Sequence, residues 1–325
     1  MIEFFQSIFP YIIPFLLGLA ALSVVMYFVF YFVASYFVYK ATLKRTSKEK
    51  WARTQNTEDA QHIQMDDEGM AWHKANKEYA RNVHITNDGL CLAGEYYDFG
   101  KKRCVIMLCG RPDSLRYGYY YVQPYSRADC NVLLVDTRAH GESEGTCITG
   151  GITESRDVLA WIRFLHDKCG MESVFIHGIC VGAAAGMLAL TSEDCPSCVE
   201  GIITDGLFTN FAQSMSNHLI ERKKPCFPVM QFINFWMNRD SGCTMNYGPL
   251  DVISKMDKRL LMLHSKDDAY SLPETAKQMF DLCPSKNKKI VWFEKCAHSY
   301  LRVTSPQKYD SAVIDFVNSL FEIKV

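Results

Sequence analysis

The chain has 325 residues, enough for one large domain or two of ordinary size. Apolar residues make up 48% of it and charged residues 22%, a balance that excludes a globally disordered chain. The formal net charge of −1 supplies no strong positive field, which argues against a general nucleic-acid-binding protein.

An uncharged, largely apolar segment extends from Phe4 to Tyr39. About 20 apolar residues span the hydrocarbon core of a bilayer, so this segment is long enough to cross one. A cleaved signal peptide has a basic start and an apolar region of about 7–15 residues. Here the apolar run is much longer, and the only charged side chain before it is Glu3. We therefore predict a transmembrane signal anchor over residues 1–40.

Basic residues follow this segment, and none precedes it. By the positive-inside rule, this pattern predicts a single-pass membrane protein whose C-terminal domain lies on the cytoplasmic side. Thirteen cysteines, an odd number in a cytoplasmic domain, indicate free thiols and not disulfides. The basic residues after the apolar segment are Lys40, Lys44, Arg45, Lys48, Lys50 and Arg53.

Residues 41–82 connect the anchor to a predicted domain over 83–325. Residues 41–56 are basic and polar, as is typical of a juxtamembrane linker, and the pattern over 57–82 predicts an amphipathic helix. Strands and helices then alternate, which predicts an α/β fold with a mostly parallel sheet covered on both faces. A hairpin turn at residues 87–89 begins the sheet. We predict strands at Val83–Thr86, Leu90–Tyr97, Cys104–Leu108, Asn131–Val135, Ser173–His177, Gly201–Ile203, Leu260–Leu263 and Lys289–Phe293, and helices near 117–126, 153–168, 182–192, 273–282 and 306–322.

The interval 208–250 is longer than a connection between two strands requires, and it is rich in large apolar residues. We predict a helical cap over the active site, with an apolar underside. A pair of ordinary helices packed on the core would use the same residues and is the alternative. The nearby Cys195-Pro-Ser-Cys198 lacks two further ligands at matching spacing, so we predict loop cysteines and no metal. No phosphate-binding loop or dinucleotide fingerprint occurs, and no cofactor is predicted.

The segment Gly178-Ile179-Cys180-Val181-Gly182 lies between a predicted strand and a helix of small residues. A strand, a sharp turn and a helix are the context of the nucleophile elbow G-x-S-x-G, here with cysteine in place of serine. Only residues without a bulky Cβ let the strand and the helix approach so closely. Cys180 is therefore the predicted nucleophile.

Partners for this nucleophile should follow in the order acid, then histidine, after later strands. Asp267 and Asp268 follow the predicted strand at Leu260–Leu263, and His298 follows the strand at Lys289–Phe293. The carboxyl ends of parallel strands meet at one edge of a sheet, so these side chains should converge on Cys180.

Over roughly residues 83–322, the chain resembles the α/β-hydrolase superfamily. Four further segments carry the resemblance in the family's order, and the segment with His264 favours Asp268 over Asp267 as the acid. The cysteine elbow is similar to that of dienelactone hydrolases and also of polyhydroxyalkanoate synthases. The four segments are Leu108-Cys-Gly-Arg111, Asp136-Thr-Arg-Ala-His-Gly-Glu-Ser-Glu-Gly145, His264-Ser-Lys-Asp-Asp268 and Ala297-His298.

The resemblance implies a role for each residue. Cys180 would attack an acyl carbonyl, His298 would accept its proton or pair with the thiolate, and Asp268 would orient the imidazole. The backbone N–H groups of Val181 and Arg111 would form the oxyanion hole, because Pro112 has no N–H to donate.

We therefore expect a membrane-anchored hydrolase that cleaves an ester or thioester of a small-molecule acyl or lipid-like substrate. Three alternatives remain open at this point. They are an acyltransferase that uses the same cysteine, a hydrolase resembling serine peptidases, and a catalytically silent scaffold in which cysteine has disabled a serine enzyme.

Overall fold

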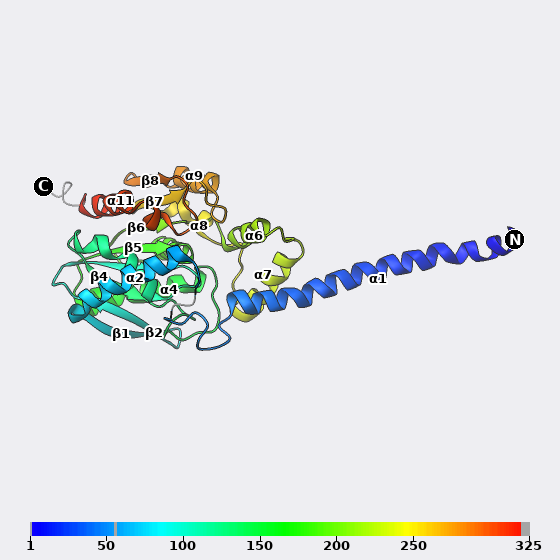
Figure 1. Cartoon of the computed structure of the whole chain (residues 1–325), viewed down its shortest axis with the longest axis horizontal. Coiled ribbons are helices and arrows are strands. Elements are labelled where there is room, and N and C mark those ends of the chain that lie inside the picture. The colour runs from blue at the N-terminus through cyan, green and yellow to red at the C-terminus, as the bar shows by residue number, and fades with distance from the viewer. Residues whose placement is uncertain (1, 55–56, 320–325) are drawn as a thin grey trace.

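A computed structural model describes residues 2–54 and 57–319, and residues 55–56 of the predicted linker and 320–322 of the last predicted helix lie outside this description. Figure 1 shows a compact domain with one long helix, α1, that projects far beyond it. The helices are α1 (Ile2–Leu43), α2 (Ala60–Ala75), α3 (Leu115–Tyr121), α4 (Ile152–Cys169), α5 (Val181–Leu190), α6 (Phe211–Glu221), α7 (Val229–Ser241), α8 (Pro249–Val252), α9 (Pro273–Leu282), α10 (Leu301–Thr304) and α11 (Pro306–Asn318), with short 3-10 turns η1 (Lys77–Tyr79), η2 (Gln123–Ser126) and η3 (Ile253–Lys255).

One eight-stranded sheet organises the domain, in the order β1-β2-β4-β3-β5-β6-β7-β8. The first two strands form the predicted hairpin, β2 pairs antiparallel with β4, and every later pair is parallel. The mostly parallel sheet is thus confirmed. The strands are β1 (Ala80–Asn87), β2 (Leu90–Tyr97), β3 (Arg103–Leu108), β4 (Asn131–Val135), β5 (Ser173–Ile179), β6 (Val199–Asp205), β7 (Arg259–Ser265) and β8 (Lys288–Phe293).

Strand β3 shows why the central strands read as continuous apolar runs. Cys104, Ile106 and Leu108 face the core beneath α4 and α5, whereas Val105 and Met107 face the core beneath α3 and α11. Successive side chains of a strand point to opposite faces, so a strand covered on both sides must be apolar at every position.

The predicted helix over 57–82 is shorter in the structure. The Asp59 carboxylate caps α2 by accepting hydrogen bonds from the N–H groups of Gln61 and His62, and α2 ends at Ala75. Residues 80–82 belong to β1, because they pair with Glu95–Tyr97 across the hairpin. The turn fixes this register and extends the strand into the segment predicted as helix.

The C-terminal part of α1 packs against the domain, as Figure 1 shows at the base of the projecting helix. The Phe32 and Tyr36 rings lie 4.7 and 5.0 Å from the ring of Trp236 in α7. Tyr39 is buried, and its hydroxyl donates to Asp240 at 3.0 Å. The residues from Pro10 to Leu43 are long and apolar enough to cross a membrane, yet the last part of this helix belongs to the domain.

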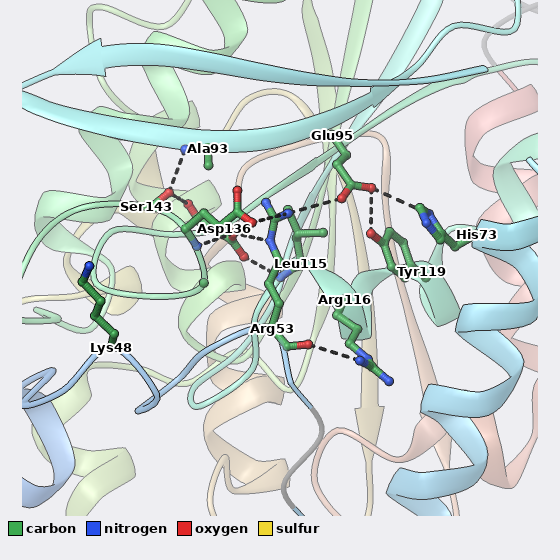
Figure 2. Close-up of polar contacts among 12 residues, drawn as sticks. Lys48, Arg53, His73, Ala93, Glu95, Leu115, Arg116, Tyr119, Asp136 and Ser143 are labelled. Carbon is green, nitrogen blue, oxygen red and sulfur yellow. Dashed lines mark hydrogen bonds and ion pairs between the residues drawn. The ribbon is translucent and has the colours of Figure 1, made fainter. Parts of the chain in front are cut away.

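A buried polar network ties the segment after α1 to the sheet (Figure 2). The Arg53 Nε donates to Asp136 at 2.8 Å, and its Nη1 lies 3.3 Å from Glu95. Glu95 also accepts a hydrogen bond of 2.6 Å from the Tyr119 hydroxyl. Burial raises the pKa of Asp136, and Arg53 opposes that rise. The network therefore depends on the Arg53 charge.

Replacing Arg53 with methionine should lower the free energy of unfolding by about 2–3 kcal/mol, because Asp136 and Glu95 would keep buried charges without their cation. Unfolding of the full-length chain in detergent at neutral pH measures this change. The exposed Lys48, which also lies in this segment, provides the control. Lys48→Met should leave stability within about 0.5 kcal/mol of wild type, as for most surface substitutions. Equal stability of the two variants would contradict the prediction.

Candidate active site

Cys180 occupies a sharp turn between β5 and α5 with a strained backbone. Its φ of +51° and ψ of −111° lie in a region that non-glycine residues rarely adopt. Such a conformation costs on the order of 1–3 kcal/mol and persists only where surrounding contacts hold it. Here the Cys180 N–H donates to the Asp205 carbonyl at 2.9 Å, and the Cys180 carbonyl accepts from Ala184 at 3.1 Å.

The glycines on either side of Cys180 are required by close packing. A Cβ at Gly178 would lie 2.5 Å from the Ala183 backbone nitrogen, and a Cβ at Gly182 would overlap the Leu108 carbonyl oxygen. The strand, the turn and the helix can therefore approach only because both positions lack a side chain. This is the steric reason for the spacing seen in the sequence.

His298 and Asp268 meet in a hydrogen bond of 2.7 Å between Nδ1 and Oδ2. The other oxygen of Asp268 accepts the N–H groups of Tyr270 and Ser271, each at 2.8 Å. Burial alone would raise the pKa of Asp268, but His298 and these hydrogen bonds lower it. Asp267 is exposed and instead accepts the Lys295 N–H at 2.7 Å. The structure thus joins His298 to Asp268, the acid that the resemblance favoured.

The remaining nitrogen of His298 faces the nucleophile. Burial alone would lower the pKa of His298, but the nearby Cys180 sulfur and the Asp268 carboxylate raise it well above its ordinary value. The Nε2 atom is buried and, apart from its contact with the Cys180 sulfur, has no hydrogen-bond partner within the described residues. A Cβ at Gly206 would lie 2.7 Å from the His298 ring, so this glycine leaves room for the imidazole. The arrangement can move a proton between Cys180 and His298.

A cavity of about 480 Å³ contains Cys180 and His298, together with the two predicted oxyanion-hole residues, Val181 and Arg111. Its size lies within the range of about 300–1,000 Å³ for small-molecule sites. Val181 begins α5, so its N–H lies at a helix N-terminus and has no partner one turn earlier. The Arg111 loop packs on the nucleophile, since a Cβ at Gly110 would lie 3.2 Å from the Cys180 Cβ.

Helix α6 forms one wall of this cavity and comes from the interval predicted as a cap. The predicted apolar underside is wrong, because α6 presents mainly polar side chains to the cavity. The large apolar residues of α7, such as Ile233 and Trp236, pack in the core beside α1 instead. Composition showed that the interval must bury apolar area, but not which of its helices would do so. The α6 residues that line the cavity, with Arg222 just after the helix, are Phe211, Ser214, His218 and Arg222.

Two other buried histidines, His177 and His140, do not line this cavity. His177 is buried and lies between the Tyr125 and Tyr309 hydroxyls, at 2.9 and 2.8 Å. His140 is buried in the loop after β4 and stacks on Trp51, with the ring centroids 4.7 Å apart. A larger cavity of about 1190 Å³ lies elsewhere and contains none of Cys180, His298 and Asp268.

Sequence reasoning missed two features of the site. Asp205, at the end of β6, is buried close to His298, and its carboxylate accepts the Tyr309 hydroxyl at 3.1 Å. Its position at the carboxyl end of a strand was the available signal. The second feature is a hydrogen bond of 2.9 Å from the Arg111 side chain to the Thr42 carbonyl near the end of α1. No local pattern reveals this contact, because 69 residues separate its two partners.

The buried Asp205 predicts a pH-dependent stability. Burial raises its pKa from 3.8 to about 7, so the folded state binds this proton more tightly than the unfolded state does. The free energy of unfolding should therefore fall as the pH rises from about 4 to about 7. Asp205→Asn should remove this fall and stabilise the chain by about 1–3 kcal/mol at pH 8, with little effect below pH 4. Thermal unfolding at both pH values tests this, with the exposed Asp194→Asn as control. A gain that is equal at pH 4 and pH 8 would rule out the charge as its cause.

Comparisons with known proteins agree with this architecture. No protein-family model matches the chain. The uncharacterized protein YqkD of Bacillus subtilis is 25% identical over 212 residues, which cover 64% of this chain and 67% of YqkD. Protein bem46 of Schizosaccharomyces pombe is 26% identical over 177 residues, so the match spans about half of bem46, 54% of its length. The solved structure of the esterase Pf2001 from Pyrococcus furiosus superposes with a TM-score of 0.63 at 20% identity, covering 76% of this chain and 95% of Pf2001. The chain has the α/β-hydrolase fold, as predicted.

Proposed function

We propose that this protein is a membrane-anchored hydrolase that cleaves an ester or thioester through Cys180, His298 and Asp268. The observation that carries the proposal is the strained turn that holds Cys180 in a cavity wall beside a histidine bonded to a buried aspartate. Strain of this kind persists where function requires it. The likeness to an esterase in fold supports hydrolysis over other chemistry.

The geometry supports a two-step mechanism. Cys180 passes its proton to His298 Nε2, its sulfur attacks the acyl carbonyl carbon, and the carbonyl oxygen becomes an oxyanion that accepts hydrogen bonds from the N–H groups of Val181 and Arg111. The intermediate collapses, the leaving alcohol or thiol takes the proton from His298 Nε2, and the acyl group remains as a thioester on Cys180. A water molecule then gives a proton to His298 and attacks the thioester, and the Cys180 sulfur leaves and regains its proton from His298 as the acid product forms.

Water is the acceptor that the cavity favours. An acyltransferase must keep water from its thioester, and an apolar cap would serve that purpose. Ser214, His218 and Arg222 instead give the α6 wall polar side chains. Hydrolysis therefore fits this wall better than transfer to an alcohol or amine.

The length of α1 supports a membrane anchor and sets its depth. The 34 residues from Pro10 to Leu43 extend for about 50 Å in a helix, more than the roughly 30 Å of a bilayer core. The stretch from Phe32 to Leu43 packs on the domain, so the residues before it are the part of α1 that can lie in the membrane. The apolar core of the membrane would then end near Phe30, with the domain on the cytoplasmic side. The proposal requires that the chain stay in the membrane fraction after alkaline carbonate washing.

Turnover of chromogenic acyl esters and thioesters, from short to long acyl chains, tests the proposed activity. The full-length chain in neutral detergent is the proper sample, because a fragment without α1 would lose Tyr39, Leu43 and the Thr42 carbonyl that binds Arg111. We expect hydrolysis and, after rapid acid quenching, an acyl adduct on the peptide that contains Cys180. An active enzyme that never carries this adduct would exclude the covalent mechanism. Absence of both turnover and adduct would favour a silent scaffold.

A further inference from the structure

Two arginines give one side of the active-site cavity a positive charge. Arg111 comes from the loop after β3, and Arg222 follows the end of α6. Both line the cavity that contains Cys180. Burial lowers the pKa of the Arg111 side chain, the Cys180 sulfur raises it, and Arg222 lowers it further. The two guanidinium groups and the nucleophile are therefore close enough to influence one another.

Neither arginine is paired with a carboxylate in the part of the chain that the structure describes. Arg111 donates one hydrogen bond, from Nη1 to the Thr42 carbonyl, and no ion pair includes Arg111 or Arg222. Arg111 is half-buried and Arg222 is exposed. Three other arginines of the domain are each bound to an acidic side chain, Arg53 to Asp136, Arg138 to Asp157, and Arg302 to Asp310.

The acidic groups that line the cavity, Asp59 and Asp113, lie beside residues of α2. Asp59 accepts the Tyr300 hydroxyl at 2.8 Å, whereas Asp113 lies 3.6 Å from the His62 ring and burial raises its pKa to about 7. Asp268 serves His298. The cavity is thus divided into an acidic side next to α2 and a basic side next to α6.

The basic side can still donate hydrogen bonds. His218 lies there, stacked on Tyr270 with the ring centroids 3.7 Å apart. Burial and the neighbouring cations lower the pKa of His218 to about 4, so it is neutral at pH 7. On this side of the cavity the positive charge therefore comes from Arg111 and Arg222 and not from His218. A guanidinium that has no carboxylate partner is free to bind an anion, and its planar shape matches the geometry of a carboxylate or phosphate.

We propose that the substrate carries an anionic group, a carboxylate or phosphate, close to the bond that is cleaved, and that Arg111 and Arg222 bind this group. This inference rests on the proposed function, because it assumes that the protein is an enzyme with a substrate. The anion site itself can be tested without turnover. It assigns the Arg111 side chain to substrate binding and its backbone N–H to the oxyanion. It also places a binding residue just after the C-terminal end of α6, on the part of the chain inserted between β6 and β7.

Alkylation of Cys180 by iodoacetate and by iodoacetamide provides the test. The two reagents transfer groups of nearly equal size to sulfur and release iodide, but only iodoacetate is an anion. Peptide mass spectrometry of the full-length chain in neutral detergent gives both rates at Cys180 and at Cys91, an exposed thiol that serves as the internal reference. We expect the rate ratio of iodoacetate to iodoacetamide to be about tenfold higher at Cys180 than at Cys91, the effect of one charge-assisted hydrogen bond. Arg222→Gln should remove most of this difference.

Lys224→Gln is the matched control. It removes the same charge from the exposed segment just beyond Arg222, and Lys224 does not line the cavity. This variant should keep the high ratio at Cys180. Equal ratios at Cys180 and Cys91 in the wild type would overturn the proposal, as would a high ratio that Arg222→Gln leaves unchanged.

A pair of esters connects the anion site to turnover. The 4-nitrophenyl monoester of glutarate and 4-nitrophenyl pentanoate share a five-carbon acyl chain, and only the first carries a carboxylate. The 3-carboxy-4-nitrophenyl and 4-nitrophenyl butanoates place the carboxylate on the leaving group instead. In at least one pair, Arg222→Gln should lower the ratio of kcat/KM for the anionic to the neutral ester about tenfold. If the alkylation ratio is high but no ester is cleaved, the anion site stands and the hydrolase proposal fails. If esters are cleaved without any preference for the anionic ester and the alkylation ratio at Cys180 equals that at Cys91, the hydrolase proposal stands and the anion site fails.

Discussion

Replacing Cys180 with alanine is expected to lower kcat/KM for ester hydrolysis by at least about a thousandfold, because the mechanism loses the atom that forms the covalent intermediate. Residual activity would come from binding and from the Val181 and Arg111 N–H groups alone. The fold should be unaffected, since alanine fits the space of cysteine in the turn. Initial rates of the full-length variant on the best chromogenic ester measure the loss.

Two further variants separate catalysis from other effects of losing a thiol. Cys195→Ala removes a partly exposed thiol from the loop between α5 and β6, which does not line the cavity. This variant should keep kcat/KM within twofold of wild type. Cys180→Ser distinguishes an active cysteine enzyme from a disabled serine enzyme. A lower rate in Cys180→Ser than in the wild type supports the cysteine mechanism, because His298 must then deprotonate a much weaker acid. A gain of activity in Cys180→Ser would mean that cysteine has disabled the site.

The fold could be predicted from the sequence because its signals are local. The runs Cys104–Leu108 and Asn131–Val135 coincide with β3 and β4 to within one residue. Strands buried on both faces must be apolar at every position, and helices must alternate with them to cover the sheet. That Cys180, Asp268 and His298 follow strands whose carboxyl ends lie at one edge of the sheet could be predicted for the same reason.

The features that were missed depend on contacts between distant segments. The Arg111 side chain reaches the end of α1, and Asp205 gains its unusual pKa only from burial beneath neighbouring strands and α11. The polar wall of the cavity has the same origin. Helices α6 and α7 are both amphipathic, and sequence alone does not say which face of either one meets the cavity.

The contact between Arg111 and Thr42 connects the proposed anchor to the proposed oxyanion hole. Lys50 donates to the Lys40 and Ala41 carbonyls in the same turn of α1, so two cations occupy the end of this helix. A helix C-terminus carries partial negative charge, which both side chains stabilise. The position of α1 thereby helps to fix the loop that holds Arg111, and the site depends on the segment that we propose as the membrane anchor.

The second large effect is expected for Asp268→Asn, with a loss of kcat/KM of about a hundredfold to ten-thousandfold at pH 7. One carboxylate oxygen of Asp268 accepts two backbone N–H groups, and the other faces His298 Nδ1. The asparagine oxygen would take the position that accepts the two N–H groups, so its NH₂ group would face the imidazole. His298 would then carry its proton on Nε2 and could not accept one from Cys180.

The pH profile of the same variant tests the charge of Asp268 separately from its geometry. The Asp268 carboxylate raises the pKa of His298, so its removal must lower that pKa. Catalysis needs a protonated His298 to give a proton to the leaving group, and the alkaline limb of kcat/KM should therefore move to lower pH in Asp268→Asn. Asp267→Asn, which alters the exposed neighbour, should move neither the rate nor this limb. If Asp268→Asn keeps a wild-type rate and an unmoved alkaline limb, the catalytic acid is another group, and the buried Asp205 beside His298 is the carboxylate that the structure offers in its place.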